Sequence, residues 1–295
     1  MAGLCCPRAL HAQFTDPRSY ANSPVGLSQL ELDYAYAKAD ASVDTSLVVA
    51  DSRLKLNMGT LAYTRDFSML HRLAWAKASV PLAYLSGSVA GTNIAGSVAG
   101  PADASFELAT LLKGGKALSI AEFSTYQPTT TLGVSLMVTA PTGKYDAARL
   151  LNLGSDRWSL RPEMALSLPF GRDRRWELDA YFNVAFFSDN TAYRGREILR
   201  QDPLTGVEAH ISYACSSSLW ASLDARYAFR GDMFVDRVDQ HDPQEGVVLG
   251  SEAVWSPGSR SSVVLVFAKA IAHKNAPAYT GVVVKLTYSW GQGNN

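Results

Sequence analysis

Apolar and polar residues alternate with a period of two along most of the chain. In the segment 157–168, Trp158, Leu160, Pro162, Met164, Leu166 and Leu168 share one side of this period, and Arg157, Ser159, Arg161, Glu163 and Ser167 share the other. Alternation at 180° per residue predicts a β-strand with two unlike faces. The polar face is heavily charged for the core of a soluble sandwich but ordinary for a wet barrel lumen, so we expect the apolar face to contact lipid.

The same pattern recurs and predicts twelve strands. We expect them at residues 30–36, 54–59, 69–85, about 103–112, 132–140, 158–168, 176–186, 207–213, 219–229, 246–255, 261–271 and 282–290. The turn-rich stretch 16–24 is expected to lead the chain to the membrane edge. The RDFS run from Arg65 predicts a tight turn, and Pro81 predicts a bend or bulge in the third strand. We expect a Gly-, Ser- and Ala-rich loop at 87–100 and an irregular or short-helical connection at 112–130.

The connections between the predicted strands alternate between long and short from the fifth strand onward. Single-chain barrels of the bacterial outer membrane have long loops outside and tight turns on the periplasmic side. The pattern therefore predicts an all-β fold, a transmembrane antiparallel β-barrel of the outer-membrane type with about twelve strands and both termini periplasmic. Aromatic residues at predicted strand ends agree with interfacial girdles: Trp158, Trp176, Trp255, Tyr288 and Trp290.

Four long motifs carry a resemblance to a known family. They are DPRSYANSPVGLSQLELDYAYAK, PTGKYD followed by LLNLGSDRWSLRPE, QDPLTGVEAHISYA and LWASLDARYAFRGD. They resemble the outer-membrane channel family associated with the meta-cleavage pathway of phenol degradation, and the likeness extends from about residue 16 to residue 290. The resemblance implies a β-barrel that passes small molecules and does not imply one agreed substrate.

Composition excludes several classes of protein. The chain has 27 basic and 27 acidic residues without a block of like charge, so no nucleic-acid partner is expected. The longest apolar runs, such as 263–268, are far shorter than the roughly 20 residues of a spanning helix. The start MAGLCCPRALHAQ predicts a signal-peptide remnant at residues 1–12, followed by a single barrel domain at 13–295. A lipidated Cys5 is the alternative, although Leu4 stands where a small residue is expected. Without the remnant, Cys215 would be the lone cysteine, and no internal disulfide could form.

The sequence predicts no catalytic, cofactor or metal site. None of its five histidines has a second histidine or cysteine at metal-ligand spacing, and none follows a Gly-x-Ser-x-Gly motif. His210, between Glu208 and Ser212 on a predicted inward face, is the residue on which an outer-membrane Ser–His hydrolase would depend. A lone lumen histidine is more often a hydrogen-bonded residue of the wall.

The inward faces predict a pore of mixed charge. Its lining is expected to include Glu31, Asp33, Lys55, Arg161, Glu163, Glu177, Asp179, Glu208, His210, Asp224, Arg226, Glu252 and Lys285. Interspersed signs favour no ion strongly. Twelve strands lie between filled barrels of about eight and open porins of about sixteen, which predicts a narrow channel constricted by 112–130 or by an infolded loop. We expect Arg157, Arg161 and Glu163 to lie beside Glu177 and Asp179 of the next strand and to pair with them.

These patterns predict passive uptake of small solutes, aromatic or otherwise hydrophobic, across the bacterial outer membrane. The expected partners are outer-membrane lipid and the solute itself. Two alternatives remain at this point: a structural or adhesive barrel that acts through its extracellular loops, and the outer-membrane hydrolase.

Overall fold

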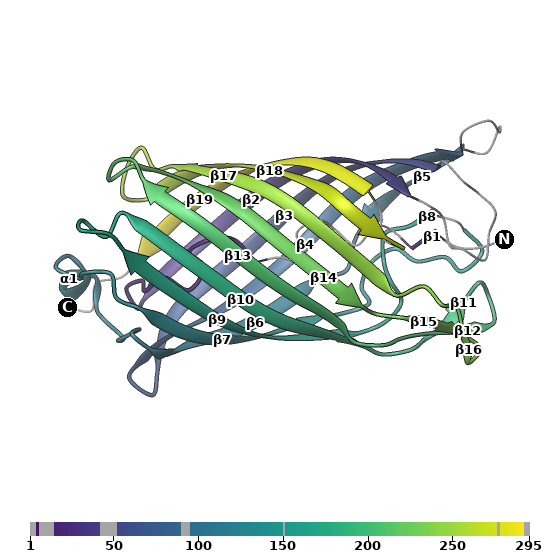
Figure 1. The fold of residues 1–295 in the computed structure, drawn as a ribbon, viewed down its shortest axis with the longest axis horizontal. Helices are drawn as coiled ribbons and strands as arrows, with labels where there is room; N and C mark the ends of the chain where they lie inside the picture. The colour runs from purple at the N-terminus through teal and green to yellow at the C-terminus, as the bar shows by residue number, and fades with distance from the viewer. Residues whose placement is uncertain are drawn as a thin grey trace.

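A computed structural model describes residues 4–5, 15–41, 52–89, 95–149, 151–275 and 278–291. They form a closed antiparallel barrel of twelve strands (Figure 1). The barrel strands are β2 Leu27–Ala41, β3 Ser52–Met69, β4 Arg72–Val89, β6 Ser105–Lys113, β7 Thr131–Thr139, β9 Ser159–Phe170, β10 Trp176–Phe187, β13 Leu204–Ala214, β14 Leu219–Arg230, β17 Gln244–Trp255, β18 Ser261–Lys274 and β19 Ala278–Gly291. The ring closes where β19 pairs with β2, with Leu27 opposite Gly291. The predicted fold class and strand number are confirmed.

The remaining elements lie at the two ends of the barrel. β5 (Ala95–Pro101) pairs with β4 beyond β6. β11 (Asn190–Tyr193), β12 (Glu197–Gln201), β15 (Met233–Val235) and β16 (Val238–Asp239) form a small separate sheet. β1 (Leu4–Cys5) pairs with β8 (Leu151–Asn152), and α1 is a single helical turn, Ile120–Phe123. Among the described residues, no helix is long and apolar enough to cross a membrane.

The two ends of the barrel differ in their connections, and we call them the short-turn end and the long-loop end. Tight connections at 70–71, 171–175, 215–218 and 256–260 define the short-turn end, and 140–158, 188–203 and 231–243 define the long-loop end. Each end has an exception. The connection 114–130, which contains α1, lies at the short-turn end, whereas β18 and β19 are joined at the long-loop end by residues 275–277 alone. The expected strand to about 112, followed by a short-helical connection, is confirmed.

Two local predictions near the third strand are wrong. The chain does not turn at Arg65, because β3 continues to Met69 and the turn is made by Leu70 and His71, both with positive φ. β4 passes Pro81 in unbroken register with β3. The break occurs instead in the neighbour, since β4 pairs with β6 before Pro81 and with β5 after it. Proline has no N–H, so this is a natural place to exchange partners.

Part of the expected loop at 87–100 is also strand. β4 extends to Val89 and β5 starts at Ala95. Residues 90–94, most of the expected loop at 39–50 and most of the expected signal remnant lie outside the described residues.

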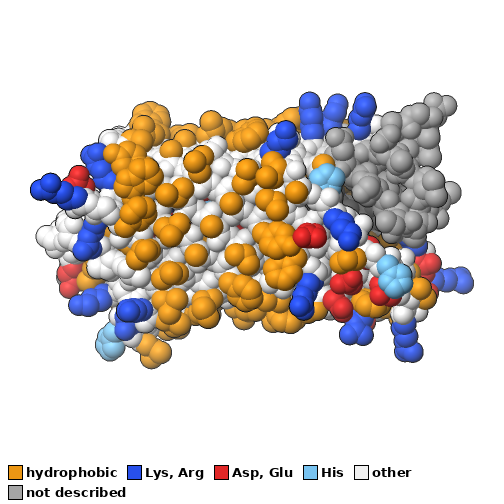
Figure 2. Space-filling model, in the orientation of Figure 1, with side chains coloured by type: hydrophobic (Ala, Val, Ile, Leu, Met, Phe, Trp, Pro, Cys, Tyr) orange, Lys and Arg blue, Asp and Glu red, His pale blue; other side chains and the backbone are white. Residues whose placement is uncertain are grey.

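The outer face of the barrel is a broad apolar belt (Figure 2). On β14, Leu223 is 68% exposed whereas the neighbouring Ser222 is 5% exposed, so alternate residues face outward and inward as predicted. The five aromatic residues predicted for the girdles are all exposed. A closed barrel with an apolar belt and aromatic strand ends is the architecture of outer-membrane proteins, and the chain is an outer-membrane β-barrel.

Candidate functional site

The lumen has a polar wall, formed by the inward faces of β9, β10, β13 and β14. Its side chains are almost completely buried although most are ionisable: Glu163, Glu177, Asp179, Asn183, Glu208, His210, Asp224 and Arg226. Burial of so many ionisable groups is costly unless each obtains partners. The partners come in large part from a segment that precedes the first barrel strand.

Residues 15–26 run inside the barrel against the polar wall, and we call them the lumen segment. The Thr15 backbone N–H donates to Glu208 Oε2 at 3.0 Å, and the Thr15 hydroxyl donates to Glu163 Oε1 at 2.8 Å. The hydroxyl of Tyr20, which is 1% exposed, donates to the same Glu163 oxygen at 2.9 Å. The prediction that the stretch 16–24 leads the chain to the membrane edge is therefore wrong, because its polar groups complement those of the lumen.

Charged residues of the lumen segment link different strands of the wall. The Arg18 backbone N–H donates to Asp179 Oδ2 at 3.0 Å, its Nε donates to Ser212 Oγ at 2.7 Å, and Nε lies 3.8 Å from Glu177 Oε2. The Arg18 guanidinium also lies over the Trp220 ring at 4.9 Å. Asp16 forms an ion pair with Lys285 of β19. The segment thus contacts strands from both sides of the ring.

The expected pairing of Arg161 and Glu163 with Glu177 and Asp179 is wrong. The β9–β10 register places Arg161 and Glu163 on the inner face, but Glu163 faces Asn183, whereas Asp179 faces Ser167. Asn183 Nδ2 donates to Glu163 Oε2 at 3.1 Å, and Ser167 donates to Asp179. The register separates the charged residues of β9 and β10, so the neighbouring strand gives Glu163 and Asp179 neutral partners. The opposite charge near Glu177 comes from Arg18 of the lumen segment.

His210 lies in the polar wall at 1% exposure. Its Nδ1 is 2.8 Å from Asp224 Oδ1, and its Nε2 is 3.7 Å from Glu208 Oε2, too far for a hydrogen bond. Ser222 donates to Asp224 at 3.0 Å, and among the described residues His210 Nε2 has no hydrogen-bond partner. The serine–histidine contact that a hydrolase requires is not formed at this position.

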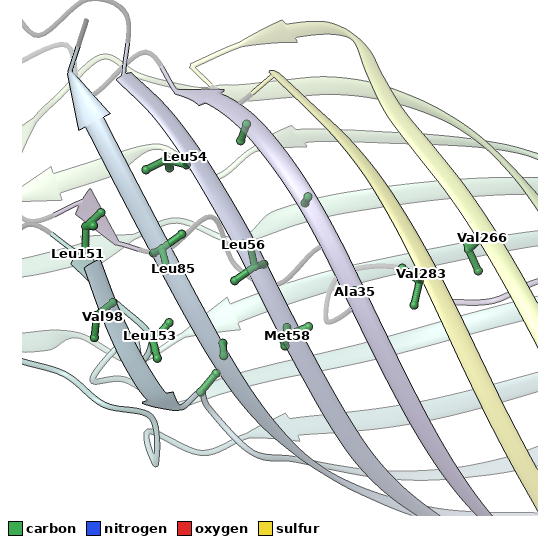
Figure 3. Close-up of a cluster of buried hydrophobic side chains, with 14 of the residues drawn as sticks. Ala35, Leu54, Leu56, Met58, Leu85, Val98, Leu151, Leu153, Val266 and Val283 are labelled. Atoms are coloured by element: carbon green, nitrogen blue, oxygen red, sulfur yellow. The ribbon is translucent and has the colours of Figure 1, made fainter. Parts of the chain in front are cut away.

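The opposite side of the lumen is an apolar wall, formed by the inward faces of β18, β19, β2, β3, β4 and β5 (Figure 3). Its members include Ala35, Ala37, Leu54, Leu56, Met58, Leu85, Val98, Val266 and Val283. Since Leu54 and Leu56 face inward, the intervening Lys55 faces outward and is exposed. The predicted place of Lys55 in the lumen is therefore wrong, because in this half of β3 the apolar side chains belong to the inner wall.

A second inward segment, the long connection 140–158, packs against the apolar wall. We call it the lumen loop. Its Leu151 and Leu153 are 8% and 5% exposed and lie among Leu54, Leu85 and Val98 of the apolar cluster (Figure 3). The motif PTGKYDAARLLNLGSDRW thus encodes a folded-in loop, and one of the two constrictions expected from the sequence is present. The other candidate, 112–130, contributes no side chain to the cavity described below.

Asp103, between β5 and β6, holds both ends of the lumen loop. Its Oδ1 accepts the Gly143 N–H at 2.9 Å, and its Oδ2 accepts the Ser155 N–H at 2.8 Å and the Ser155 hydroxyl at 2.7 Å. Gly143 and Gly154 approach so closely that a Cβ on Gly154 would lie 2.6 Å from the Gly143 carbonyl oxygen. A side chain at either glycine would force the two ends of the loop apart.

A cavity of about 550 Å³ remains between the two walls. It extends from Asp66 and Leu73 near the short-turn end to Leu56 and Leu153 towards the long-loop end. Four of the predicted pore residues border it: Glu31, Asp33, Arg161 and Lys285. The other inward residues of the prediction pack outside this cavity: Glu163, Glu177, Asp179, Glu208, His210, Asp224, Arg226 and Glu252.

The charged groups at the cavity differ in how well they are paired. Lys77 Nζ lies 2.9 Å from Glu31 Oε1, and Glu107 accepts the Trp75 indole N–H at 3.0 Å. Arg161 is 6% exposed, and its Nε and Nη1 have no hydrogen-bond partner among the described residues. It is therefore a buried cation available to a group in the cavity. In the part of the chain that the structure covers, no cluster of His, Cys, Asp and Glu could hold a metal ion.

Sequence patterns missed the lumen segment and Asp103, and they predicted an infolded loop without identifying which loop it is. Alternation identifies a strand face but cannot show that a preceding coil folds back into the lumen. The density of polar and turn-forming residues in DPRSYANS was the available signal, because such a stretch can satisfy buried carboxylates. Asp103 carried no signal in sequence, since its role depends on two backbone N–H groups at least 40 residues away.

Solved structures agree with this architecture. An outer membrane channel from Pseudomonas putida F1 is 21% identical, covers 94% of this chain and 100% of its own, and superposes with a TM-score of 0.81. The β domain of the Bordetella autotransporter BrkA is 11% identical, with coverage of 90% and 100% and a TM-score of 0.55. The transport unit of the Escherichia coli autotransporter AIDA-I is 8% identical, with coverage of 96% and 95% and a TM-score of 0.51. At these identities the likeness concerns the fold.

Sequence comparison gives the family. No curated protein matches the chain. A family model does match, over residues 38–286, with the description "Putative MetA-pathway of phenol degradation". Because the match covers most of the barrel, the chain belongs to this family.

Proposed function

We propose that this protein is an outer-membrane channel for passive uptake of small solutes that are aromatic or otherwise hydrophobic. The observation that carries the proposal is the cavity of about 550 Å³ between an apolar and a polar wall. Sites for small molecules are commonly concave, of about 300–1,000 Å³, and mainly apolar with a few polar groups. Leu56, Met58 and Leu153 would contact the hydrocarbon part of the solute, and Arg161 would contact its polar part.

The residues of the predicted pore divide into two roles in this proposal. Glu31, Asp33, Arg161 and Lys285 line the permeation path. The buried carboxylates of the polar wall hold the lumen segment in place and so set the width of that path. The fold shared with the Pseudomonas putida outer membrane channel supports a channel function. The absence of a serine contact at His210 disfavours the hydrolase, so we propose a channel that is not an enzyme.

Flux through proteoliposomes tests the proposal. We expect benzyl alcohol and benzoate to enter protein-containing vesicles faster than empty vesicles, and a disaccharide of larger cross-section to be excluded. In planar bilayers, Arg161→Ala should shift ion selectivity towards cations, because it removes a cation from the cavity wall. Arg260→Ala, in an exposed short turn, removes the same charge away from the lumen and should leave selectivity unchanged.

Two results would contradict the proposal. Absence of both conductance steps and solute flux would favour the structural or adhesive barrel, with the small sheet at the long-loop end as its contact surface. Unchanged selectivity in a folded Arg161→Ala protein would place Arg161 away from the permeation path.

A further inference from the structure

Three lysines lie in one row on the outer wall at the long-loop end. Residue Lys269 of β18 is in register with Thr280 of β19, Thr280 with Lys38 of β2, and Lys38 with Lys55 of β3. All four side chains are exposed. With neighbouring strands about 4.8 Å apart, the row from Lys269 to Lys55 spans about 14 Å.

These three lysines have no anionic partner within the described ranges. Lys38 Nζ lies over the Tyr36 ring, 6.0 Å from its centroid, and none of the three lysines has an ion pair in these ranges. Lys38 and Lys55 oppose each other directly, an arrangement of like charges that destabilises a strand pair. A bound anion between them would remove the repulsion.

The row lies at the border of the apolar belt. Two residues closer to the membrane centre along each strand, the next outward positions are in register with one another. They are Phe267, Val282, Tyr36, Asn57 and Tyr84. Figure 2 shows basic side chains along the long-loop border of the hydrophobic surface. Because the long loops of such barrels face outside, the three lysines lie at the headgroup level of the outer leaflet.

The in-register row of lysines occupies the neighbouring strands β18, β19, β2 and β3. On β6 and β10 and just before β9, the exposed side chains near the long-loop end include the aromatic residues Phe106, Trp158 and Phe186, and Arg230 at the end of β14 is a separate exposed cation. Cations that served only to solvate the barrel would not need to share one register level, whereas these three lysines lie at the same level on three of four neighbouring strands. Lysines next to a membrane surface attract anionic headgroups.

We propose that Lys38, Lys55 and Lys269 form a binding site for the phosphates of the outer-leaflet glycolipid, lipopolysaccharide. The headgroup of this lipid carries two phosphates on a disaccharide. The adjacent pair Lys38 and Lys55 would bind one phosphate, and Lys269, with the Thr280 hydroxyl beside it, would bind the other. The acyl chains would lie on Phe267, Val282 and Tyr84. This site is independent of solute passage.

The test compares two variants of equal charge. The triple variant K38Q/K55Q/K269Q removes the row, whereas K113Q/R172Q/R260Q removes three exposed cations at the short-turn end. Native mass spectrometry of the purified full-length protein would measure bound lipopolysaccharide during titration. Each lysine near an anionic surface contributes about fivefold in affinity, so we expect the row variant to bind on the order of 100-fold more weakly. The short-turn variant should bind like wild type.

Competition experiments distinguish lipopolysaccharide from other phosphate-containing ligands. Equal binding by wild type and the row variant, or no binding by wild type, would overturn the proposal. The same would follow if phosphatidylglycerol or inorganic phosphate at equal phosphate concentration displaced lipopolysaccharide completely. Retained heat-modifiable gel mobility would show that each variant still forms a barrel.

Discussion

The two walls of the lumen each hold one inward segment, by opposite means. The polar wall binds the lumen segment through directed contacts, such as those of Glu163 with Thr15 and Tyr20. The apolar wall binds the lumen loop through Leu151 and Leu153. Asp103 and a few backbone contacts, such as the Lys144 N–H with the Pro101 carbonyl oxygen at 2.8 Å, add directed hydrogen bonds. One barrel therefore combines a network in which each partner is specific with a surface whose attraction depends mainly on buried area.

This difference has a consequence for sensitivity to substitution. Loss of one member of a buried polar network leaves its partners without compensation, so a small chemical change has a large effect. An apolar contact loses stability in proportion to the atoms removed and to the cavity left behind. The polar wall should therefore be the more fragile of the two.

The largest effect is expected for Glu163→Ala. The substitution removes the acceptor of Thr15, Tyr20 and Asn183, and we expect it to lower the free energy of unfolding by about 3–5 kcal/mol. Urea titration of protein in lipid vesicles would measure this, and trypsin should cut more rapidly after Arg18 once the segment is released. Glu107→Ala removes a single described bond, from Trp75, and should cost only about 1 kcal/mol. Similar costs at the two sites would refute the special fragility of the polar wall.

A smaller, local effect is expected for Leu153→Ala on the apolar side. The leucine is 5% exposed, and the cost should be about 2 kcal/mol, the lower end for buried leucines, because a loop can collapse onto the wall. Hydrogen exchange should rise across 140–158 while β3 and β4 stay protected. Val238→Ala, at 64% exposure in the small sheet, should change the free energy by less than about 0.5 kcal/mol. Faster exchange throughout the barrel would mean that the loop supports the whole wall.

The smallest effect is expected for Asp103→Asn, which preserves shape but removes the charge. One oxygen remains to accept, so we expect a loss of about 1–2 kcal/mol, confined to the ends of the lumen loop. Amide exchange at Gly143 and Ser155, whose N–H groups donate to Asp103, should accelerate most. The exposed Asp189→Asn is the matched control. Protection that persists at Gly143 and Ser155 would show that the apolar contacts of Leu151 and Leu153, with the hydrogen bonds of Lys144 to β5, suffice to hold the loop.

The barrel could be predicted well from the sequence because the alternation of apolar and polar residues depends only on neighbours within one strand. Each strand must place apolar side chains outward, so Leu219, Leu223 and Tyr227 on β14 could be assigned from alternation alone, and the structure confirms them as exposed. The rule failed on β3, where Leu54, Leu56 and Met58 face inward. Alternation identifies two faces, but it cannot tell which one meets lipid when the inner wall is also apolar.

The lumen itself was harder to predict because its partners are distant in sequence. Glu163 and Asp179 were correctly assigned inward, but the choice of partner depended on register and on a coil more than 140 residues away. Pairing between adjacent strands was the natural expectation from neighbouring charges. The register excludes it by opposing Glu163 to Asn183.

The lumen segment also constrains the order of assembly. Its hydrogen bonds to the polar wall join residues 143 to 211 positions apart, and the contact of Asp16 with Lys285 joins residues 269 positions apart. Such non-local contacts form slowly because a long chain must first be brought together. Lys285 belongs to β19, which closes the ring against β2, so Asp16 can reach it only when the last strand is in place. The barrel thus surrounds residues 15–26, and if this segment were outside when the ring closed, it would have to pass through the finished barrel.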